Sequence, residues 1–242
     1  MAIAADDILI MQVFMRANQF IPDTVTGWTR MSYANSSFSG ATFWRRATGS
    51  ESGTINVSTY AASDVDNYAV MYRFSGCVTT GNPYEENGGS TQANSAAVAI
   101  ASMTTAGTYR LCFHGMGVAN DVGQDDNATY YVEQEDELMT DGSDANLCLY
   151  LYEKASAGAI NDSYTQAAAA GGYKLKMALK PVASAYPVYE DNGGFVYNYG
   201  KSIDVPYPAA SVGYANDVIS VASGIIGKVN GVATANIAKV VV

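Results

Sequence analysis

The fold is decided by residues 6–76, whose apolar runs read ILIMQVFM (8–15), TGWT (26–29), FWRRAT (43–48) and YAVMYRFSG (68–76). β-Branched and aromatic residues are frequent in these runs, and Gly, Asn, Asp, Pro or Ser bounds each of them. This pattern is typical of strands joined by turns. Because no run places apolar residues at helical spacing over about 11 residues, the segment predicts an all-β fold.

The same succession of runs returns about a hundred residues later, as YRLCFHGM (109–116), LCLYLYEKAS (147–156) and GYKLKMAL (172–179). We interpret the repetition as a degenerate internal duplication, although any all-β chain can offer such matches. Two antiparallel strand sets can bury their apolar faces against each other. The sequence therefore predicts a jelly-roll-like, pseudo-duplicated antiparallel β-sandwich over residues 1–181, built from strand sets 6–76 and 95–180.

The remaining segments are predicted to be loops and a C-terminal extension. Residues 77–93 are rich in Gly, Pro and Asn and predict a crossover loop. Residues 155–172 are small and polar, and we expect a loop there with at most one helical turn. Residues 182–242 combine a Tyr-rich segment with a β-prone tail (218–242), which would favour aggregation unless it is covered.

Composition limits the class of protein. The 242 residues suffice for one large all-β domain, and only 15% of them are charged while 18 are Tyr. A net charge of -10 argues against nucleic-acid binding and against an anionic membrane surface. No apolar run reaches the roughly 20 residues of a membrane span, and no signal peptide is evident at the N-terminus. The three cysteines, Cys77, Cys112 and Cys148, are expected to be buried free thiols. This expectation indicates that the chain is made in a reducing compartment.

Sequence motifs for catalysis are not found. The single histidine, His114, lies in an apolar strand and is expected to be structural. Neither a Gly-x-Ser-x-Gly elbow nor a nucleotide-binding glycine motif occurs. We therefore predict no catalytic residue, no cofactor and no metal, while a glycosidase-type carboxylate pair stays open because only the fold brings such a pair together.

Two features have both a structural and a functional interpretation. The acidic segment 121–144 could hold a cation, but its spacing does not fit an EF-hand loop, and a solvated acidic sheet edge is favoured. Trp28 could stack on a ligand, but a position at one end of the core is favoured.

Four segments together resemble the β-sandwich domain of structural proteins of tailed bacteriophages: DILI (7–10), GWT (27–29) and the runs at 43–48 and 68–76. The tail sequence GKVNGVATANIAK (227–239) is similar to short repeats at the ends of phage virion and appendage proteins. The resemblance covers residues 6–180 and the tail, although YYV (130–132) replaces the Gly-Trp step in the second half. It implies a structural protein without a catalytic motif.

The main hypothesis is a non-enzymatic virion protein, either a head (capsid) decoration or a tail appendage, assembled in the host cytoplasm. Its expected partners are other virion proteins and copies of itself. The predicted assembly contact consists of Tyr197, Tyr199, Tyr207, Ile225, Ile226, Val229, Ile237 and Val240. The alternative is a carbohydrate- or receptor-binding module of a tail fibre, whose aromatic side chains stack on a host-surface glycan. A glycan-degrading enzyme is the third reading.

Overall fold

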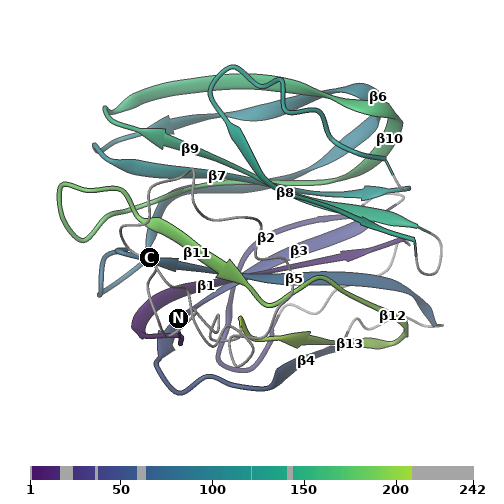
Figure 1. Ribbon diagram of the computed structural model, residues 1–242, viewed down its shortest axis with the longest axis horizontal. Coiled ribbons are helices and arrows are strands. Elements are labelled where there is room, and N and C mark those ends of the chain that lie inside the picture. Colours follow the sequence, from purple (N-terminus) through teal and green to yellow (C-terminus); the bar gives the residue numbers. More distant parts are fainter. Residues whose placement is uncertain are drawn as a thin grey trace, which may run out of the picture.

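The computed structural model describes residues 2–16, 24–35, 38–58, 64–120, 122–140 and 144–208 (Figure 1). These residues form strands and no helix, so the all-β prediction is confirmed, and none of them belongs to a helix that could span a membrane. The strands are β1 (Ala5–Met15), β2 (Thr29–Asn35), β3 (Ser39–Thr48), β4 (Thr54–Ser58), β5 (Val65–Ser75), β6 (Tyr84–Thr105), β7 (Arg110–Ala119), β8 (Val132–Met139), β9 (Ala145–Lys154), β10 (Gly158–Leu179), β11 (Val188–Asn192), β12 (Val196–Gly200) and β13 (Ser202–Pro206).

Two antiparallel sheets stack as a sandwich (Figure 1). The first sheet has the order β11-β5-β1-β3-β2, with β12 also paired to β5, and the second has the order β6-β10-β7-β9-β8. A small third sheet pairs β13 with β4. The predicted antiparallel β-sandwich is therefore present.

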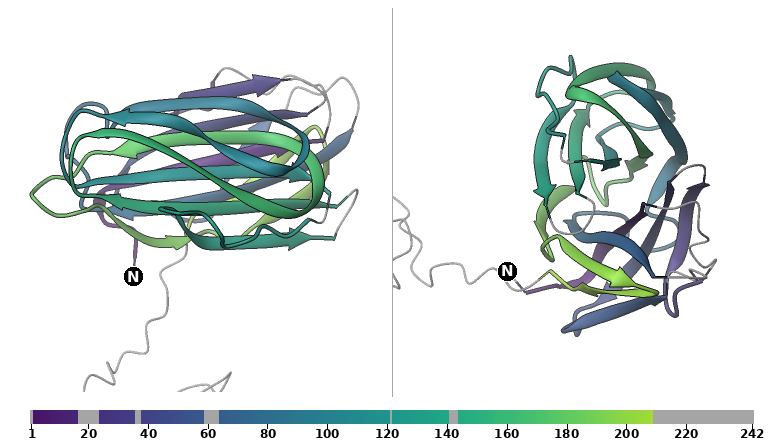
Figure 2. Two further views of the ribbon diagram at one scale, coloured as in Figure 1. Left: turned by 90° about the horizontal axis from the view of Figure 1, so that it is seen from above. Right: turned by 90° about the vertical axis from the view of Figure 1, so that its right-hand side faces the viewer.

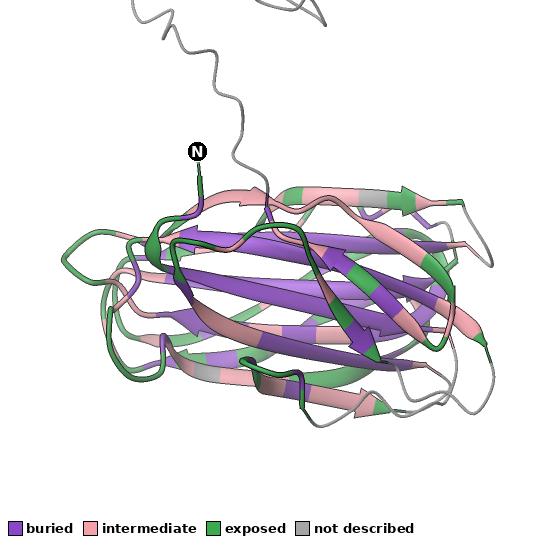
Figure 3. Cartoon of the chain, turned by 90° about the horizontal axis from the view of Figure 1, so that it is seen from below, coloured by how far each residue is buried: buried purple, intermediate pink, exposed green. Residues whose placement is uncertain are grey.

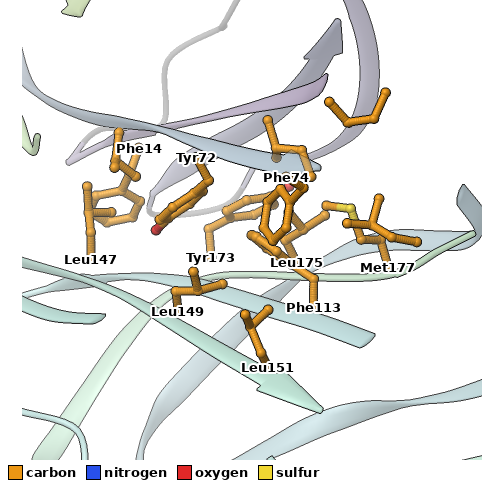
Figure 4. Packing of buried hydrophobic residues seen from close by; sticks show 14 of the residues in the cluster. Phe14, Tyr72, Phe74, Phe113, Leu147, Leu149, Leu151, Tyr173, Leu175 and Met177 are labelled. Atoms are coloured by element: carbon orange, nitrogen blue, oxygen red, sulfur yellow. The ribbon is translucent and has the colours of Figure 1, made fainter. Parts of the chain in front are cut away.

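The main core fills the space between the two sheets (Figure 4). Phe14, Tyr72 and Phe74 extend from the first sheet, and Phe113 and Leu149 extend toward them from the second. The rings of Phe74 and Phe113 pack edge to face, with centroids 5.9 Å apart. This apolar contact is the principal force holding the sheets together.

The outer face of each sheet is covered as well (Figure 2). Val57 of β4 and Ile203 of β13 pack on the outer face of the first sheet. Ile100 and Tyr164, from the far halves of β6 and β10, pack on the outer face of the second. Central strands are thus buried along nearly their whole length (Figure 3), which explains why their sequences are continuously apolar and do not alternate.

The predicted loops at 77–93 and 155–172 are largely wrong. Strand β6 already begins at Tyr84, and β10 extends from Gly158 to Leu179. The two strands pair along most of their length, with register shifts that include one between Thr165 and Ala170. Long-range pairing of these small, polar residues with each other overrides their weak intrinsic preference for strands.

Strand pairing continues past residue 181, where the sandwich was expected to end. Strands β11 and β12 extend the first sheet along β5, and β13 pairs with β4. The β-prone tail, including Ile225, Ile226, Val229, Ile237 and Val240, lies outside the described residues. The internal duplication stays a prediction, although β5-β1-β3-β2 and β10-β7-β9-β8 occupy corresponding places in their sheets.

Polar contacts join the two sheets at both sides of the sandwich. On one side the hydroxyls of Ser32 in β2 and Tyr173 in β10 lie 2.5 Å apart. On the other side Tyr189 of β11 donates its hydroxyl hydrogen to Glu135 of β8 over 2.5 Å, and the Asn192 amide donates to the same carboxylate over 2.9 Å. This second side holds the candidate site.

Candidate functional site

A groove of about 500 Å³ lies where the edge of the second sheet meets β11. We call it the tyrosine groove, and its lining consists of Leu111, Tyr130, Val132, Gln134, Leu151, Tyr152, Glu153, Pro187, Val188 and Tyr189. Tyr130, Val132 and Val188 are 49%, 55% and 52% exposed, although all three are large and apolar. Exposed apolar side chains that gather in one hollow mark a candidate ligand site.

Tyr130 is held at the groove by a carboxylate from a distant strand. Asp162 of β10 accepts hydrogen bonds from the backbone N–H groups of Thr129 (3.0 Å), Tyr130 (2.7 Å) and Tyr131 (3.2 Å). Partial burial acts to raise the pKa of Asp162, but these bonds and one from Ser163 hold it below its ordinary value. The turn is therefore fixed, with Tyr131 buried in the outer core and Tyr130 exposed.

Two aromatic surfaces contribute to the lining of the groove. The rings of Tyr130 and Tyr152 lie with centroids 5.5 Å apart at an angle of 36°. Tyr189 packs against Phe74, with centroids 5.6 Å apart, while its hydroxyl is bound by Glu135. Because core contacts and a hydrogen bond fix Tyr189, little conformational entropy is lost when a ligand contacts it.

The charge in the groove is negative. Among the residues that line it, Glu153 is the single Asp or Glu, and none is Lys, Arg or His. Two further carboxylates stand on β8, the strand that supplies Val132 and Gln134 to the lining. Glu135 binds Tyr189, and Glu133 accepts a hydrogen bond from the Tyr150 hydroxyl over 2.7 Å. The nearby Arg110 is paired with Glu85 over 2.8 Å. Aromatic faces combined with polar groups such as Gln134 suit a ligand that has both apolar faces and hydroxyl groups.

His114 is buried, as expected. Its Nε2 atom lies 3.3 Å from the Tyr164 hydroxyl, among the rings of Tyr131 and Tyr150. Burial lowers the pKa of His114 to about 3, so the imidazole is neutral at physiological pH. The three cysteines are also buried and free.

The acidic segment forms an edge strand, β8, of the second sheet. Asp136 accepts hydrogen bonds from the backbone N–H of Gln124 over 3.1 Å and from the side-chain amide of Asn146 over 2.5 Å. In the part of the chain that the structure describes, no three His, Cys, Asp or Glu side chains gather as a metal site would require. Asp136 thus serves as a hydrogen-bond acceptor for neighbouring protein groups.

The described tyrosines of the predicted assembly contact have different surroundings. Tyr199 is 63% exposed on β12. Tyr197 packs on Tyr68, with centroids 5.4 Å apart, and its hydroxyl donates to Asp66 over 2.9 Å. Tyr207 stacks on Trp28, which is buried in the outer core of the first sheet, as expected for it. The role of these tyrosines in assembly stays a prediction.

Sequence reasoning did not find the tyrosine groove. Tyr189 was placed in the Tyr-rich segment, while Tyr130, Tyr152 and Glu153 were not proposed for binding. One signal was present: when two tyrosines adjoin at the end of a loop, as Tyr130 and Tyr131 do, their side chains can point in opposite directions. Strands β8 and β11 are more than 40 residues apart in the sequence. The periodicity of the sequence therefore cannot reveal that they lie side by side.

Comparisons with family models, with curated proteins and with solved structures found no match to this chain.

Proposed function

We propose that the chain is a non-enzymatic carbohydrate-binding protein and that the tyrosine groove is its binding site. The observation that carries the proposal is the gathering of exposed Tyr130, Val132 and Val188 in one hollow with Tyr152 and Tyr189. The apolar face of a sugar ring can lie on an aromatic ring, and the hydroxyl groups at its rim can bond to groups such as Gln134 and Glu153.

Truncation of the aromatic surface tests the proposal. A glycan microarray probed with the full chain identifies a ligand, and calorimetry then measures its affinity for Tyr130→Ala and Tyr152→Ala. Because an aromatic contact contributes about 0.5–1.5 kcal/mol beyond its buried area, each change should weaken binding roughly tenfold. The glycan should remain intact after prolonged incubation, since the proposed role is binding without turnover.

Tyr199→Ala is the matched control. Tyr199 is at least as exposed as Tyr130, but it pairs opposite Asp66 of β5, whereas Tyr189 of the groove pairs opposite Phe74. Eight strand residues correspond to about 26 Å. Two outcomes would contradict the proposal. One is an equal loss of glycan affinity in all three variants, and the other is the absence of saturable glycan binding by the unaltered chain.

We propose, as a second function, that the sandwich is displayed on a phage particle as a head decoration or tail appendage and that the tail of the chain attaches it. Support comes from the resemblance of residues 6–180 to phage structural domains. The described chain ends at Pro208, next to the small third sheet, where the backbone N–H of Tyr207 donates a hydrogen bond to the Gly53 carbonyl oxygen.

A further inference from the structure

We infer that the tyrosine groove selects uncharged glycans and rejects acidic ones, and that Glu153 is the residue that determines this specificity. The inference rests on the proposed carbohydrate-binding function and adds the class of ligand. It follows from the carboxylates at and near the groove, which belong to β8 and β9 of the second sheet.

Three carboxylates stand on the two strands, β8 and β9, that border the groove. Glu153 lines the groove, and Glu133 and Glu135 stand on either side of Gln134, a lining residue of β8. Glu135 is held against Tyr189 of the lining. Burial and the neighbouring Asp136, Asp126 and Asp125 raise the pKa of Glu133, so negative charge there is already costly before any ligand arrives.

The two cations that adjoin lining residues in the chain, Arg110 and Lys154, do not themselves line the groove. Arg110, next to Leu111 of the lining, binds the Glu85 carboxylate through Nε (2.8 Å) and Nη2 (2.9 Å). Lys154, next to Glu153, is buried, and its backbone lies opposite Arg110 in the β7–β9 pair. A uronate or sialate carboxylate in the groove would therefore meet like charge without a compensating partner among the lining residues.

The uncharged side chains of the groove suit a neutral sugar. Tyr130, Tyr152 and Tyr189 offer rings, and Gln134 offers an amide that both donates and accepts hydrogen bonds. Glu153, when ionised, accepts hydrogen bonds only, so it suits sugar hydroxyl groups that donate. An uncharged hexose unit satisfies both requirements.

Matched ligand pairs test the inference. The probes are tetrasaccharides of glucose, galactose and mannose, each paired with the tetrasaccharide of the corresponding uronic acid, so that only the C6 group differs. Calorimetry with the full chain at low salt should give at least tenfold weaker binding for the uronate member of any pair that binds. The ratio of the affinity for the neutral member to that for the uronate member should decrease at high salt, because salt screens repulsion between exposed charges.

Two variants locate the effect. Glu153→Gln should narrow the gap between neutral and uronate affinity at least threefold at low salt. Asp204→Asn removes the same charge from β13 of the small third sheet and should leave the gap as it is. Equal narrowing in both variants would assign the selectivity to the net charge of the molecule and overturn the role of Glu153.

The two proposals fail in different ways. A uronate that binds the unaltered chain as tightly as its neutral counterpart overturns the inference and leaves carbohydrate binding intact. Lack of binding by every probe and on a glycan microarray overturns carbohydrate binding itself, and the inference with it.

Discussion

Tyr173 illustrates, at the scale of single residues, how closely the two sheets fit. Its ring lies in the main core, and its hydroxyl contacts Ser32 of the opposite sheet. Gly40 of β3 faces this ring, and a Cβ atom built on Gly40 would overlap it. Gly117 leaves room in the same way for Phe14, whose ring would lie 2.8 Å from an added Cβ atom. Glycine here provides space for an aromatic ring from the facing sheet.

Gly40→Ala is therefore expected to destabilise the fold by about 1–3 kcal/mol, because the added methyl group overpacks the core against a ring that is fixed at both ends. Guanidinium chloride unfolding measures the difference. Gly88→Ala is the control, since its Cβ would meet the flexible end of Lys176 at 3.3 Å. Equal stability of Gly40→Ala and the unaltered protein would show that the sheets can shift to accommodate it.

His114 predicts a dependence of stability on pH. Its folded pKa of about 3 lies below the ordinary value of 6.5, so between these values the unfolded chain binds a proton that the folded chain does not. The free energy of unfolding should thus fall by up to about 1.4 kcal/mol per pH unit as pH drops below 6.5. His114→Gln should remove this slope between pH 6.5 and 5, above the range of most carboxylates.

Proton NMR offers an independent check of the same prediction. Because His114 is the only histidine of the chain, its imidazole signals in untagged protein need no assignment. They should not titrate between pH 8 and 5. A midpoint near 6.5 would show that the imidazole is accessible to water and would contradict its burial.

At the scale of elements, β10 performs two tasks. Residues 172–179 lie inside the second sheet between β6 and β7, whereas Ile160 and Tyr164 belong to the far half, which covers the outer face of that sheet. The register shifts between Thr165 and Gly172 separate the two halves. The far half also carries Asp162, so the covering layer positions the turn that presents Tyr130.

Asp162→Asn should loosen this turn, because the amide keeps one acceptor oxygen in place of a carboxylate that serves four N–H donors. A loss of about 1 kcal/mol is expected at pH 7 from the weaker, partly solvated hydrogen bonds. The folded pKa of Asp162 is lowered, so its contribution is present above pH 3.8 and disappears as pH falls through the folded pKa. The difference in thermal stability between the two proteins should therefore be largest at pH 7 and should shrink as the pH falls below 3.8.

The matched control for this change is Asp204→Asn, whose carboxylate accepts one hydrogen bond from Asn56 on an exposed pair of strands. A smaller effect at pH 7 is expected there. If Asp162→Asn is no more destabilising than Asp204→Asn, the carboxylate does not organise the turn.

The sequence predicted those elements whose own residues favour strands. Residues 8–15, 43–48 and 68–76 form β1, β3 and β5, because β-branched and aromatic residues dominate them. It could not predict that Gly88, Gly89 and Ala170 lie in strands, since their pairing partners are about 80 residues away and supply the stabilisation. The groove was missed for the same reason: it exists only where β8 and the segment before β11 come together.

At the scale of the whole molecule, the sandwich and the tail are expected to be separable. Residues 3–207 supply all of the described strands and all three apolar cores, so deletion of residues 217–242 should leave the circular dichroism spectrum and the unfolding midpoint nearly unchanged. The deletion should abolish self-association, which light scattering after size exclusion measures. A truncated chain that assembles as the full chain does would contradict an attachment role for the tail.

The pairing of β11 and β12 with β5 also affects the order in which the protein can mature during translation. Strand β5 leaves the ribosome early, but the partners of its outer edge, residues 188–200, are among the last described residues to be made. Domains normally fold as units from the N-terminus as they emerge. In this protein the outer edge of β5 stays unpaired until the second sheet and then β11 and β12 have been synthesised. Binding of a chaperone to this exposed edge would be most needed during that interval.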